Sequence, residues 1–221
     1  MNFSEPMTKD FSEVTTPSGG RNQIGQVMGR KGQDTRARLL TAVVRLIADR
    51  PLRDLKVSDI AREASVGASS FYVYFPDVSA AVLAARDQHS QATPELLAIV
   101  ESDWTPANAY ARAHAFVVAY RGFWKDNFAL LRARNLAYDE GDQRFRLQRC
   151  KDIEPILLRL AAKAEDSQRM GLLPEGIQAR RVASVCLASV ERLAAGNRLT
   201  EEAVDAAAYV MTAALGLYRP A

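Results

Sequence analysis

Hydrophobic residues recur at helical spacing near the start of the folded part of the chain. Between residues 33 and 49, four apolar side chains fall at positions i, i+4, i+7 and i+8: Leu39, Val43, Leu46 and Ile47. This spacing places them on one face of a helix. Pro51 follows, and proline cannot continue a helix because it lacks the backbone donor. The pattern predicts a helix over residues 33–49.

Two shorter segments come next. Val57, Ile60, Ala61 and Ala64 have helical spacing, and the pattern breaks at residues 65–67. The aromatic run 71–75 favours a strand by propensity. No second strand is available to pair with it, and an isolated strand leaves its backbone groups without partners. We therefore predict a short helix there.

The remainder is predicted to be helical almost throughout, which makes the fold class all-α. The predicted segments are 77–90, 94–103, 106–126, 128–138, 143–169, 175–195 and 201–217, separated by proline and glycine. Pro155 is expected to kink or divide the longest of them. Residues 1–32 are polar and turn-rich without sustained periodicity, and they are predicted to form a flexible tail.

Composition excludes several classes of protein. With 48% hydrophobic and 25% charged residues in 221, the chain is expected to bury a core rather than remain disordered. The charge-free segment 206–218 is shorter than the roughly 18 apolar residues of a membrane helix, and no secretory signal is evident. We expect a soluble, cytoplasmic protein without a membrane partner.

Cysteine and histidine are too few and too scattered for a disulfide framework or a zinc site. Cys150 and Cys186 lie in separate helical segments, and His89 and His114 have no Cys or His neighbours. We expect no metal and no cofactor.

Positive charge is concentrated in one part of the chain. Residues 30–86 carry ten basic and six acidic side chains, whereas the rest of the sequence has no basic excess. A local basic excess suits a polyanion such as DNA, because Lys and Arg near phosphates release counterions. An ordinary solvated basic face is the alternative.

The segments 57–64 and 68–75 match a helix-turn-helix, whose second helix enters the DNA major groove. Ala61 is the small residue where the two helices approach, with Val66, Phe71 and Tyr74 fixing the second helix against the first. Small hydroxylated residues suit groove contacts, and tyrosine hydroxyls can reach phosphates. The predicted DNA-contacting residues are Lys56, Val66, Gly67, Ala68, Ser69, Ser70, Tyr72 and Tyr74. For Tyr72 and Tyr74, a role as core aromatics remains the alternative.

These residues resemble the DNA-binding signature of the TetR family of transcriptional regulators. The resemblance rests on the run VSDIAREASV at 57–66 followed by SFYVYFP at 70–76. It implies a homodimer with a three-helix head at residues 33–78 and a helical effector-binding and dimerisation domain at 79–221. It also implies a repressor that a small molecule releases from double-stranded DNA.

The sequence departs from the family pattern at four positions. Ser65 and Ser69 stand where glycine is frequent, so a left-handed backbone at Ser65 is expected to be slightly strained. Lys56 replaces a helix-capping Thr or Ser, and Val78 replaces a lysine that touches phosphate. The basic pair at 30–31 is placed to enter the minor groove as an arm, with a plain disordered tail as the alternative.

Aromatic residues on the segment from Pro106 suggest an apolar ligand pocket. Phe116, Tyr120, Phe123 and Trp124 share one helical face, and further aromatics follow. The predicted pocket residues are Phe116, Tyr120, Phe123, Trp124, Tyr138 and Phe145. A packed core without a ligand is the alternative for each of them.

The last two helices are apolar on more than one face, so one face is expected to need a partner. By the resemblance, they form a four-helix dimer interface. The predicted interface residues are Val182, Val185, Leu193, Val204, Ala208, Met211 and Leu215. Burial of both faces within one chain is the alternative.

The sequence thus predicts a DNA-binding repressor that acts as a homodimer on a palindromic operator and responds to a hydrophobic small molecule. The alternative is a DNA-bound activator or structural protein without an effector. An enzyme is not expected, because the sequence has no nucleophile–base pair, phosphate-binding loop or metal cluster.

Overall fold

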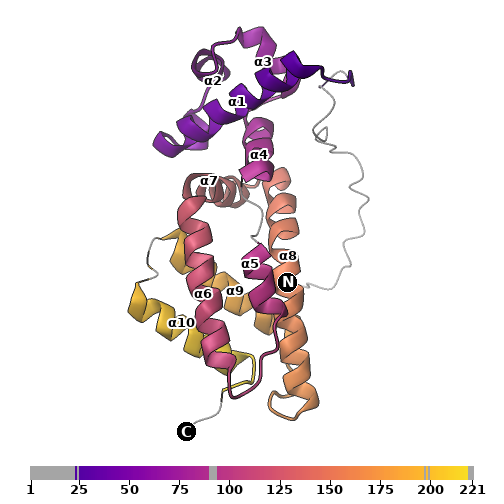
Figure 1. Ribbon diagram of the computed structural model, residues 1–221, viewed down its shortest axis with the longest axis vertical. Coiled ribbons are helices and arrows are strands. Elements are labelled where there is room, and N and C mark those ends of the chain that lie inside the picture. Colours follow the sequence, from indigo (N-terminus) through magenta and orange to yellow (C-terminus); the bar gives the residue numbers. More distant parts are fainter. Residues whose placement is uncertain (1–22, 24, 90–93, 197, 199, 219–221) are drawn as a thin grey trace. The chain divides into compact units, whose positions relative to one another are not determined.

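The computed structural model describes residues 23, 25–89, 94–196, 198 and 200–218 (Figure 1). All the elements within these residues are α-helices, apart from one short 3-10 helix, as the predicted all-α class requires. The chain divides into two compact units, with the boundary between Ala85 and Arg86. No helix among the described residues is long and apolar enough to cross a membrane.

The N-terminal unit packs three helices around an apolar core. Its elements are α1 (Arg30–Asp49), a 3-10 turn (Leu52–Asp54), α2 (Val57–Glu63), α3 (Ala68–Tyr74) and the first part of α4 (Val78–His89). The stripe of α1 supplies Leu39 and Val43, α2 supplies Ile60 and α3 supplies Phe71, all fully buried. The short helix predicted over the aromatic run is confirmed.

Six helices follow in the C-terminal unit: α5 (Pro94–Glu101), α6 (Ala109–Asp126), α7 (Phe128–Asp139), α8 (Gln143–Arg169), α9 (Ala179–Ala195) and α10 (Glu201–Ala214). The most extensive helix–helix contacts join α8 to α9 and α6 to α10 (Figure 1). Their facing apolar residues form one continuous core, to which α5 also contributes.

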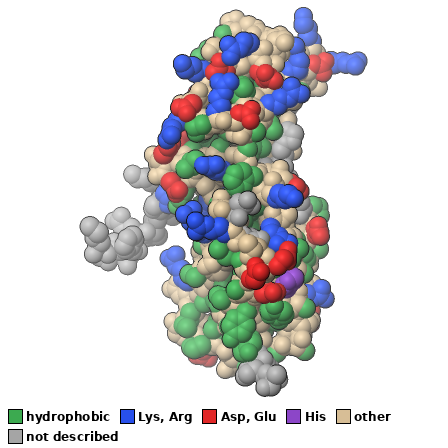
Figure 2. Space-filling model, turned by 90° about the vertical axis from the view of Figure 1, so that its left-hand side faces the viewer, with side chains coloured by type: hydrophobic (Ala, Val, Ile, Leu, Met, Phe, Trp, Pro, Cys, Tyr) green, Lys and Arg blue, Asp and Glu red, His purple; other side chains and the backbone are tan. Residues whose placement is uncertain are grey.

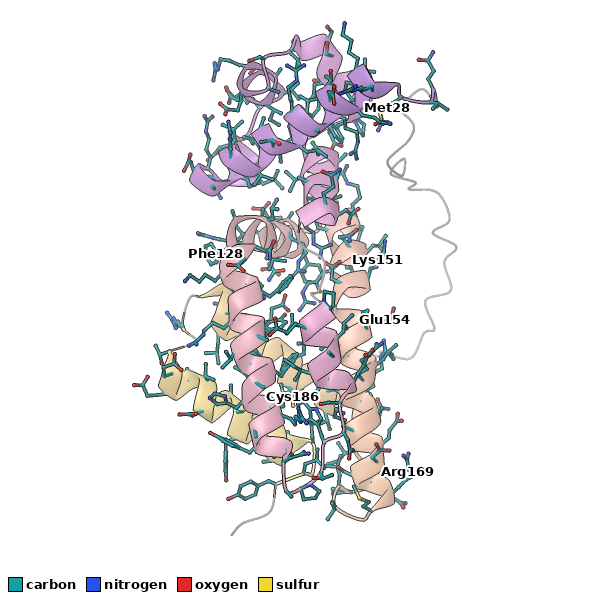
Figure 3. The ribbon with its side chains drawn as sticks, in the orientation of Figure 1. Met28, Phe128, Lys151, Glu154, Arg169 and Cys186 are labelled. Atoms are coloured by element: carbon teal, nitrogen blue, oxygen red, sulfur yellow. The ribbon has the colours of Figure 1, made fainter. Side chains whose placement is uncertain are left out.

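Pro155 does not divide α8. The helix runs without interruption from Gln143 to Arg169. In Figure 3, Lys151 and Glu154 precede the proline on this helix and Arg169 ends it. Proline removes only one intrahelical donor, so a long helix whose apolar face is packed on both sides of that point tolerates it. The buried residues Ile156, Leu157 and Leu160 directly follow the proline and hold the helix in place.

The predicted tail is wrong at its C-terminal end. Helix α1 begins at Arg30 rather than Gln33, so Arg30 and Lys31 lie in its first turn. Met28 is buried, and the side chain of Gln33 donates a hydrogen bond to the Met28 carbonyl. A single buried methionine in a polar segment leaves no periodic signal, which is why the pattern missed it. The rest of the predicted tail, apart from residues 23 and 25–29, lies outside the described residues.

Candidate DNA-binding surface and ligand sites

The turn between α2 and α3 has the geometry of a helix-turn-helix. Ala61 is buried, and its carbonyl accepts a hydrogen bond of 2.9 Å from the Val66 N–H, which closes the turn. Ser65 adopts a φ of 53°, in the left-handed region where glycine is favoured. The strain expected at Ser65 is therefore present. Lys56 precedes α2 without a side-chain cap, as its departure from Thr or Ser suggests.

Aromatic packing fixes α3 from beneath. The rings of Phe71 and Phe75 lie 5.6 Å apart, and both are buried. The Arg36 guanidinium of α1 sits 5.4 Å from the centre of the Phe75 ring. Because these contacts hold one face of α3, the opposite face is presented outward.

Most of the predicted DNA-contacting residues lie on this outward side. Lys56, Gly67, Ala68, Ser69 and Tyr72 are exposed, while Val66, Ser70 and Tyr74 are half-buried. Tyr72 is 55% exposed, although its ring also meets the edge of Phe71 at 5.6 Å. Val73, which was left out of the predicted set, is exposed on the same helix. A continuous face of α3 is therefore accessible to DNA.

Tyr74 lies differently from Tyr72. It is half-buried, and a Cβ atom at Gly32 of α1 would stand 3.7 Å from its hydroxyl oxygen. The Tyr74 side chain therefore packs toward the first turn of α1. This position favours the packing alternative for Tyr74 over a contact with phosphate.

Gln23 ties the C-terminal end of α3 to the segment before α1. Its backbone N–H donates to the Val73 carbonyl at 3.0 Å, and its side-chain amide donates to the Tyr74 carbonyl at 3.2 Å. The last carbonyls of a helix have no intrahelical partners, so these two bonds satisfy groups that otherwise need water. Sequence reasoning missed this contact because it joins residues 51 positions apart.

Two acidic residues of the N-terminal unit are engaged by arginines. Asp59 accepts from Arg50 at 2.9 Å and from Arg62 at 2.8 Å, and Glu63 pairs with Arg45 at 3.3 Å. Arg30, Lys31, Arg38, Arg53 and Lys56 are also exposed. Figure 2 shows blue basic side chains interspersed with red acidic ones over this unit. The surface therefore retains a basic excess.

The predicted aromatic pocket is mainly packed core. Phe116, Trp124 and Phe145 are fully buried, and Tyr120 is nearly so. Burial raises the pKa of the Tyr120 hydroxyl, because the phenolate form is disfavoured away from water. Tyr120, Phe123 and Trp124 line a cavity, whose volume of about 20 Å³ is close to that of one water molecule. The structure thus brings together part of the predicted set, without space for a larger ligand.

Tyr138 lines a different and larger site. A groove of about 700 Å³ lies among α7, α8 and α9, and Tyr138 is the one predicted pocket residue on its wall. Phe128, the first residue of α7, also lines this groove (Figure 3). Polar and charged side chains make up much of its lining, including Arg132, Arg149 and Arg192. Hydrophobic periodicity gave no sign of this groove.

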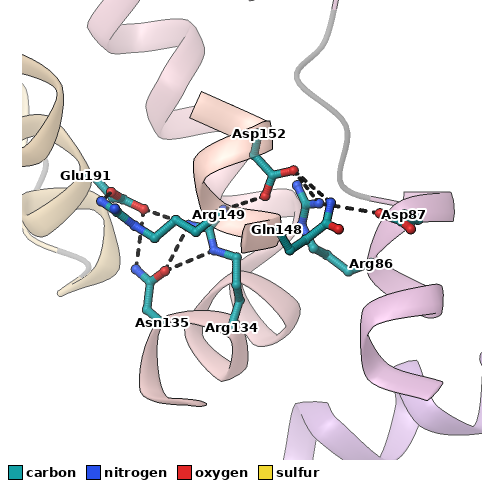
Figure 4. Close-up of polar contacts among 8 residues, drawn as sticks. All are labelled: Arg86, Asp87, Arg134, Asn135, Gln148, Arg149, Asp152 and Glu191. Carbon is teal, nitrogen blue, oxygen red and sulfur yellow. Dashed lines mark hydrogen bonds and ion pairs between the residues drawn. The ribbon is translucent and has the colours of Figure 1, made fainter. Parts of the chain in front are cut away.

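A buried ion network crosses the C-terminal unit, comprising Arg86, Arg134, Arg149, Asp152 and Glu191 (Figure 4). Asp152 pairs with Arg86 at 2.5 Å and with Arg134 at 3.0 Å. Glu191 accepts from Arg134 at 2.6 Å and also pairs with Arg149. The network joins the end of α4 to α7, α8 and α9.

Burial is the largest single influence on the pKa values of Arg86, Arg149 and Asp152. It raises the pKa of Asp152, and the attraction of Arg86 and Arg134 only partly opposes this effect. It also lowers the pKa of Arg86, against the pull of Asp152. For Arg149 the carboxylate of Glu191 outweighs burial, so that its pKa is raised. The charges are thus costly to bury and depend on one another.

The predicted dimer residues fall on two different faces. Val204, Ala208, Met211 and Leu215 are buried in the core of their own unit, so the prediction of an interface role for them must be corrected. Val185 is 66% exposed, and Val182 and Leu193 are half-buried. Spacing identified two apolar faces on α10 without showing which one points inward.

The outward apolar face runs along α9 and α10. Val210 is 55% exposed and Tyr209 is 48% exposed. A groove of about 400 Å³ lies between the two helices, with Ser189 as its only hydroxyl-bearing side chain and with Leu193, Ala206 and Val210 on its walls. Figure 2, viewed from the side of α10, shows hydrophobic side chains gathered there. Such a surface is typical of one that meets another protein.

Metal ligation finds no support among the described residues, since they contain no group of three or more His, Cys, Asp or Glu side chains placed to hold an ion. Cys150 is exposed and Cys186 is buried, and both are free thiols. Burial raises the pKa of the Cys186 thiol to about 11, which keeps it protonated at neutral pH.

Comparison with solved structures identifies the fold. A putative TetR-family regulator from Rhodococcus matches with a TM-score of 0.61 and 18% identity, covering 82% of this chain and 99% of that one. FadR from Bacillus subtilis, in complex with stearoyl-CoA, matches with a TM-score of 0.60 and 15% identity, covering 81% and 97%.

Sequence comparison adds a relative. The HTH-type transcriptional regulator EthR of Mycobacterium tuberculosis is 32% identical over 81 residues, which span 37% of this chain and 35% of EthR. The match thus covers about a third of the length of that relative.

Two family models cover most of the described chain. Residues 39–84 match the bacterial regulatory proteins of the tetR family, and residues 96–215 match the tetracyclin repressor-like C-terminal domain. The first contains the helix-turn-helix, and the second contains the groove and the apolar face of α9 and α10. The chain therefore belongs to the TetR family of DNA-binding transcriptional regulators.

Proposed function

We propose that this regulator is a repressor that binds a palindromic operator as a homodimer and leaves it when a small molecule binds the C-terminal unit. The outward face of α3 carries the proposal. Exposed Ser69 and Tyr72 stand over a buried aromatic support, at the N-terminal and central part of a recognition helix. Narrow hydroxyl side chains fit a groove and can donate to or accept from base edges and phosphates.

Dimerisation follows from the apolar face of α9 and α10. Exposed Val185 and Val210 lie on neighbouring helices beside an apolar groove, and a two-fold axis brings two such faces together as a four-helix interface. In a dimer of this kind, two copies of α3 meet successive major grooves, about 34 to 36 Å apart. The operator is accordingly palindromic.

The effector acts on the spacing of the two recognition helices. A ligand that binds better to a conformation with another spacing lowers the DNA affinity by its differential binding energy, typically about 1 to 3 kcal/mol. The FadR relative was solved with an acyl-CoA, and this supports a ligand response in the present chain. A hydrophobic ligand that enters beside Tyr120 and Trp124 must displace packed side chains, since the cavity there is only about 20 Å³.

Helix α4 is the proposed lever. It passes without a break from the N-terminal unit into the C-terminal unit at Arg86. Arg86 is anchored to Asp152 on α8, so a shift of α8 is transmitted to the end of α4 through a charge-assisted hydrogen bond.

Tyr72 provides the test of DNA binding. After selection of bound fragments from a genomic DNA pool, we expect Tyr72→Ala to weaken operator binding about tenfold at fixed salt, because it removes an exposed groove contact. Tyr72→Phe isolates the hydroxyl. Tyr110→Phe, which alters an exposed tyrosine of the C-terminal unit, is the matched control. Equal gel-shift affinities of wild type and Tyr72→Ala contradict the assignment.

A regulator without an effector is the second candidate. The dense packing around Phe116, Trp124 and Phe145 favours it, since these side chains leave little space for a ligand. Thermal melting against lipids, acyl thioesters and aromatic compounds separates the two, because a ligand that binds the folded state raises the melting temperature. A shift that also weakens DNA binding supports the repressor, and no shift with any compound supports the second candidate.

A further inference from the structure

The groove among α7, α8 and α9 combines features of a binding site that the packed aromatic core lacks. Its volume of about 700 Å³ lies in the range of pockets that hold small organic ligands. One wall carries apolar and aromatic side chains, among them Phe128, Leu136 and Tyr138. Leu136 and Tyr138 are exposed within one chain.

Three guanidinium groups converge on the same groove. Arg132 comes from α7, Arg149 from α8 and Arg192 from α9, so no single helix explains the cluster. Arg149 is engaged by Glu191, whereas Arg132 and Arg192 are exposed and no ion pair links either of them to another described residue. The side chain of Arg198 also passes beside Gly196, at the edge of the groove.

Two acidic side chains line the groove, and one of them is neutralised by neighbouring arginines. Glu191 is almost fully buried and is neutralised by Arg134 and Arg149. Asp139 is exposed at the end of α7. The remaining charge is therefore positive, on Arg132 and Arg192, against a single exposed carboxylate.

Aromatic rings hold two of the guanidinium groups in place. The Arg132 guanidinium lies 5.9 Å from the centre of the Phe128 ring, and that of Arg149 lies 5.6 Å from the centre of the Tyr138 ring. Planar guanidinium groups in such positions bind carboxylate, sulfonate or phosphate oxygens through paired N–H donors. The neighbouring rings accept a flat or apolar body by stacking.

We propose that this groove binds an amphipathic organic anion, with its acidic group at Arg132 and Arg192 and its apolar body against Phe128, Leu136 and Tyr138. This inference deepens the proposed function, because it names the class of effector and places it outside the packed aromatic face of α6. Arg149 then links the ligand to Glu191 and the buried ion network, which ends at Arg86 on α4.

Anilinonaphthalene sulfonate is a suitable probe, and N-phenylnaphthylamine is its neutral counterpart. We expect the sulfonate to bind the full chain more tightly than the neutral amine and to weaken as salt is added. Arg132→Gln combined with Arg192→Gln should raise the Kd of the sulfonate about tenfold and leave that of the amine unchanged. Arg112→Gln combined with Arg181→Gln, which changes two exposed arginines outside the groove, is the matched control.

Leu136→Asp is a second variant. It places a negative charge in the groove, which repels the sulfonate and should produce the same loss of sulfonate affinity. Circular dichroism checks that each variant is folded. Equal sulfonate affinity in wild type and the groove variants overturns the site, and so does a loss that the control shares. Gel shifts on the same proteins measure operator binding with and without the sulfonate. If the sulfonate binds the groove but does not change operator binding, the regulatory role is refuted while the binding site stands.

Discussion

Ser65 places a side chain where the backbone favours none. Its φ of 53° follows from the sharp turn that lets the Val66 N–H reach the Ala61 carbonyl. For a residue with a Cβ atom this left-handed conformation costs about 1 to 2 kcal/mol. The DNA-binding turn therefore carries local strain that the packing of α2 and α3 offsets.

Ser65→Gly should stabilise the protein by about 0.5 to 1 kcal/mol, since relief of the strain exceeds the added entropy of glycine in the unfolded chain. Ser69→Gly is the control of opposite sign, because Ser69 lies inside α3, where glycine costs helix stability. Urea unfolding of both variants measures the two effects. A destabilised Ser65→Gly protein contradicts the strain argument.

Asp142 acts at the start of α8 as a single residue with two tasks. Its carboxylate accepts from the Arg144 backbone N–H at 2.9 Å and pairs with the Arg144 side chain. The hydrogen bond from the Arg144 side chain, together with the backbone donors, holds the pKa of Asp142 below its ordinary value of 3.8.

Asp142→Ala should cost about 1 kcal/mol at neutral pH through loss of the cap. A lowered native pKa means that the carboxylate contributes fully above pH 3.8 and loses its contribution as the pH falls through the native value. The difference in stability between wild type and variant should therefore shrink on acidification. Denaturant titrations at neutral pH and near pH 3 measure it, and a difference that grows in acid argues against the sign.

At the scale of elements, the buried ion network connects residues of four helices. Its charges come from α4, α7, α8 and α9, and all its carboxylates are shared between two arginines. Removing one partner from a buried ion pair is strongly unfavourable, because the remaining charge stays away from water.

Asp152→Asn should lower the free energy of unfolding by about 3 kcal/mol, because it removes the carboxylate charge that Arg86 and Arg134 share. Asp166→Asn, on the same helix, is the matched control. Asp166 is exposed and pairs with Arg169 one turn away, so its loss should cost less than about 0.5 kcal/mol. Chemical denaturation of both variants decides, and similar losses refute a special role for the network.

Helical spacing predicted the elements well because each helix has a repeating apolar face. It did not predict which face of α10 points inward, since Ala206 and Val210 repeat with the same spacing as Val204 and Ala208. The ion network was also out of reach, because Arg86 reaches Asp152, and Glu191 reaches Arg134, only through the packing of distant segments. Contacts of this kind carry no local pattern.

At the scale of the whole molecule, the apolar face of α9 and α10 is the proposed dimer interface. We expect Val210→Glu to convert a dimer into a monomer, because a buried unpaired carboxylate opposes association. Leu158→Glu, at an exposed apolar position on α8, is the control. Sedimentation velocity measures the mass. The monomeric variant should also lose operator affinity, since one recognition helix then contacts one half-site; a dimeric Val210→Glu protein refutes this interface.

The two bonds from Gln23 to the end of α3 also bear on how the protein is handled. The proposed DNA-binding surface depends on residues before the first helix, because Gln23 supplies two hydrogen bonds to the end of α3. If the chain is shortened to begin at Arg30, or a tag is fused directly to Arg30, the Val73 and Tyr74 carbonyls lose these donors. We then expect the C-terminal end of α3 to fray. A shortened protein that binds DNA poorly would then report a lost cap rather than a wrong operator.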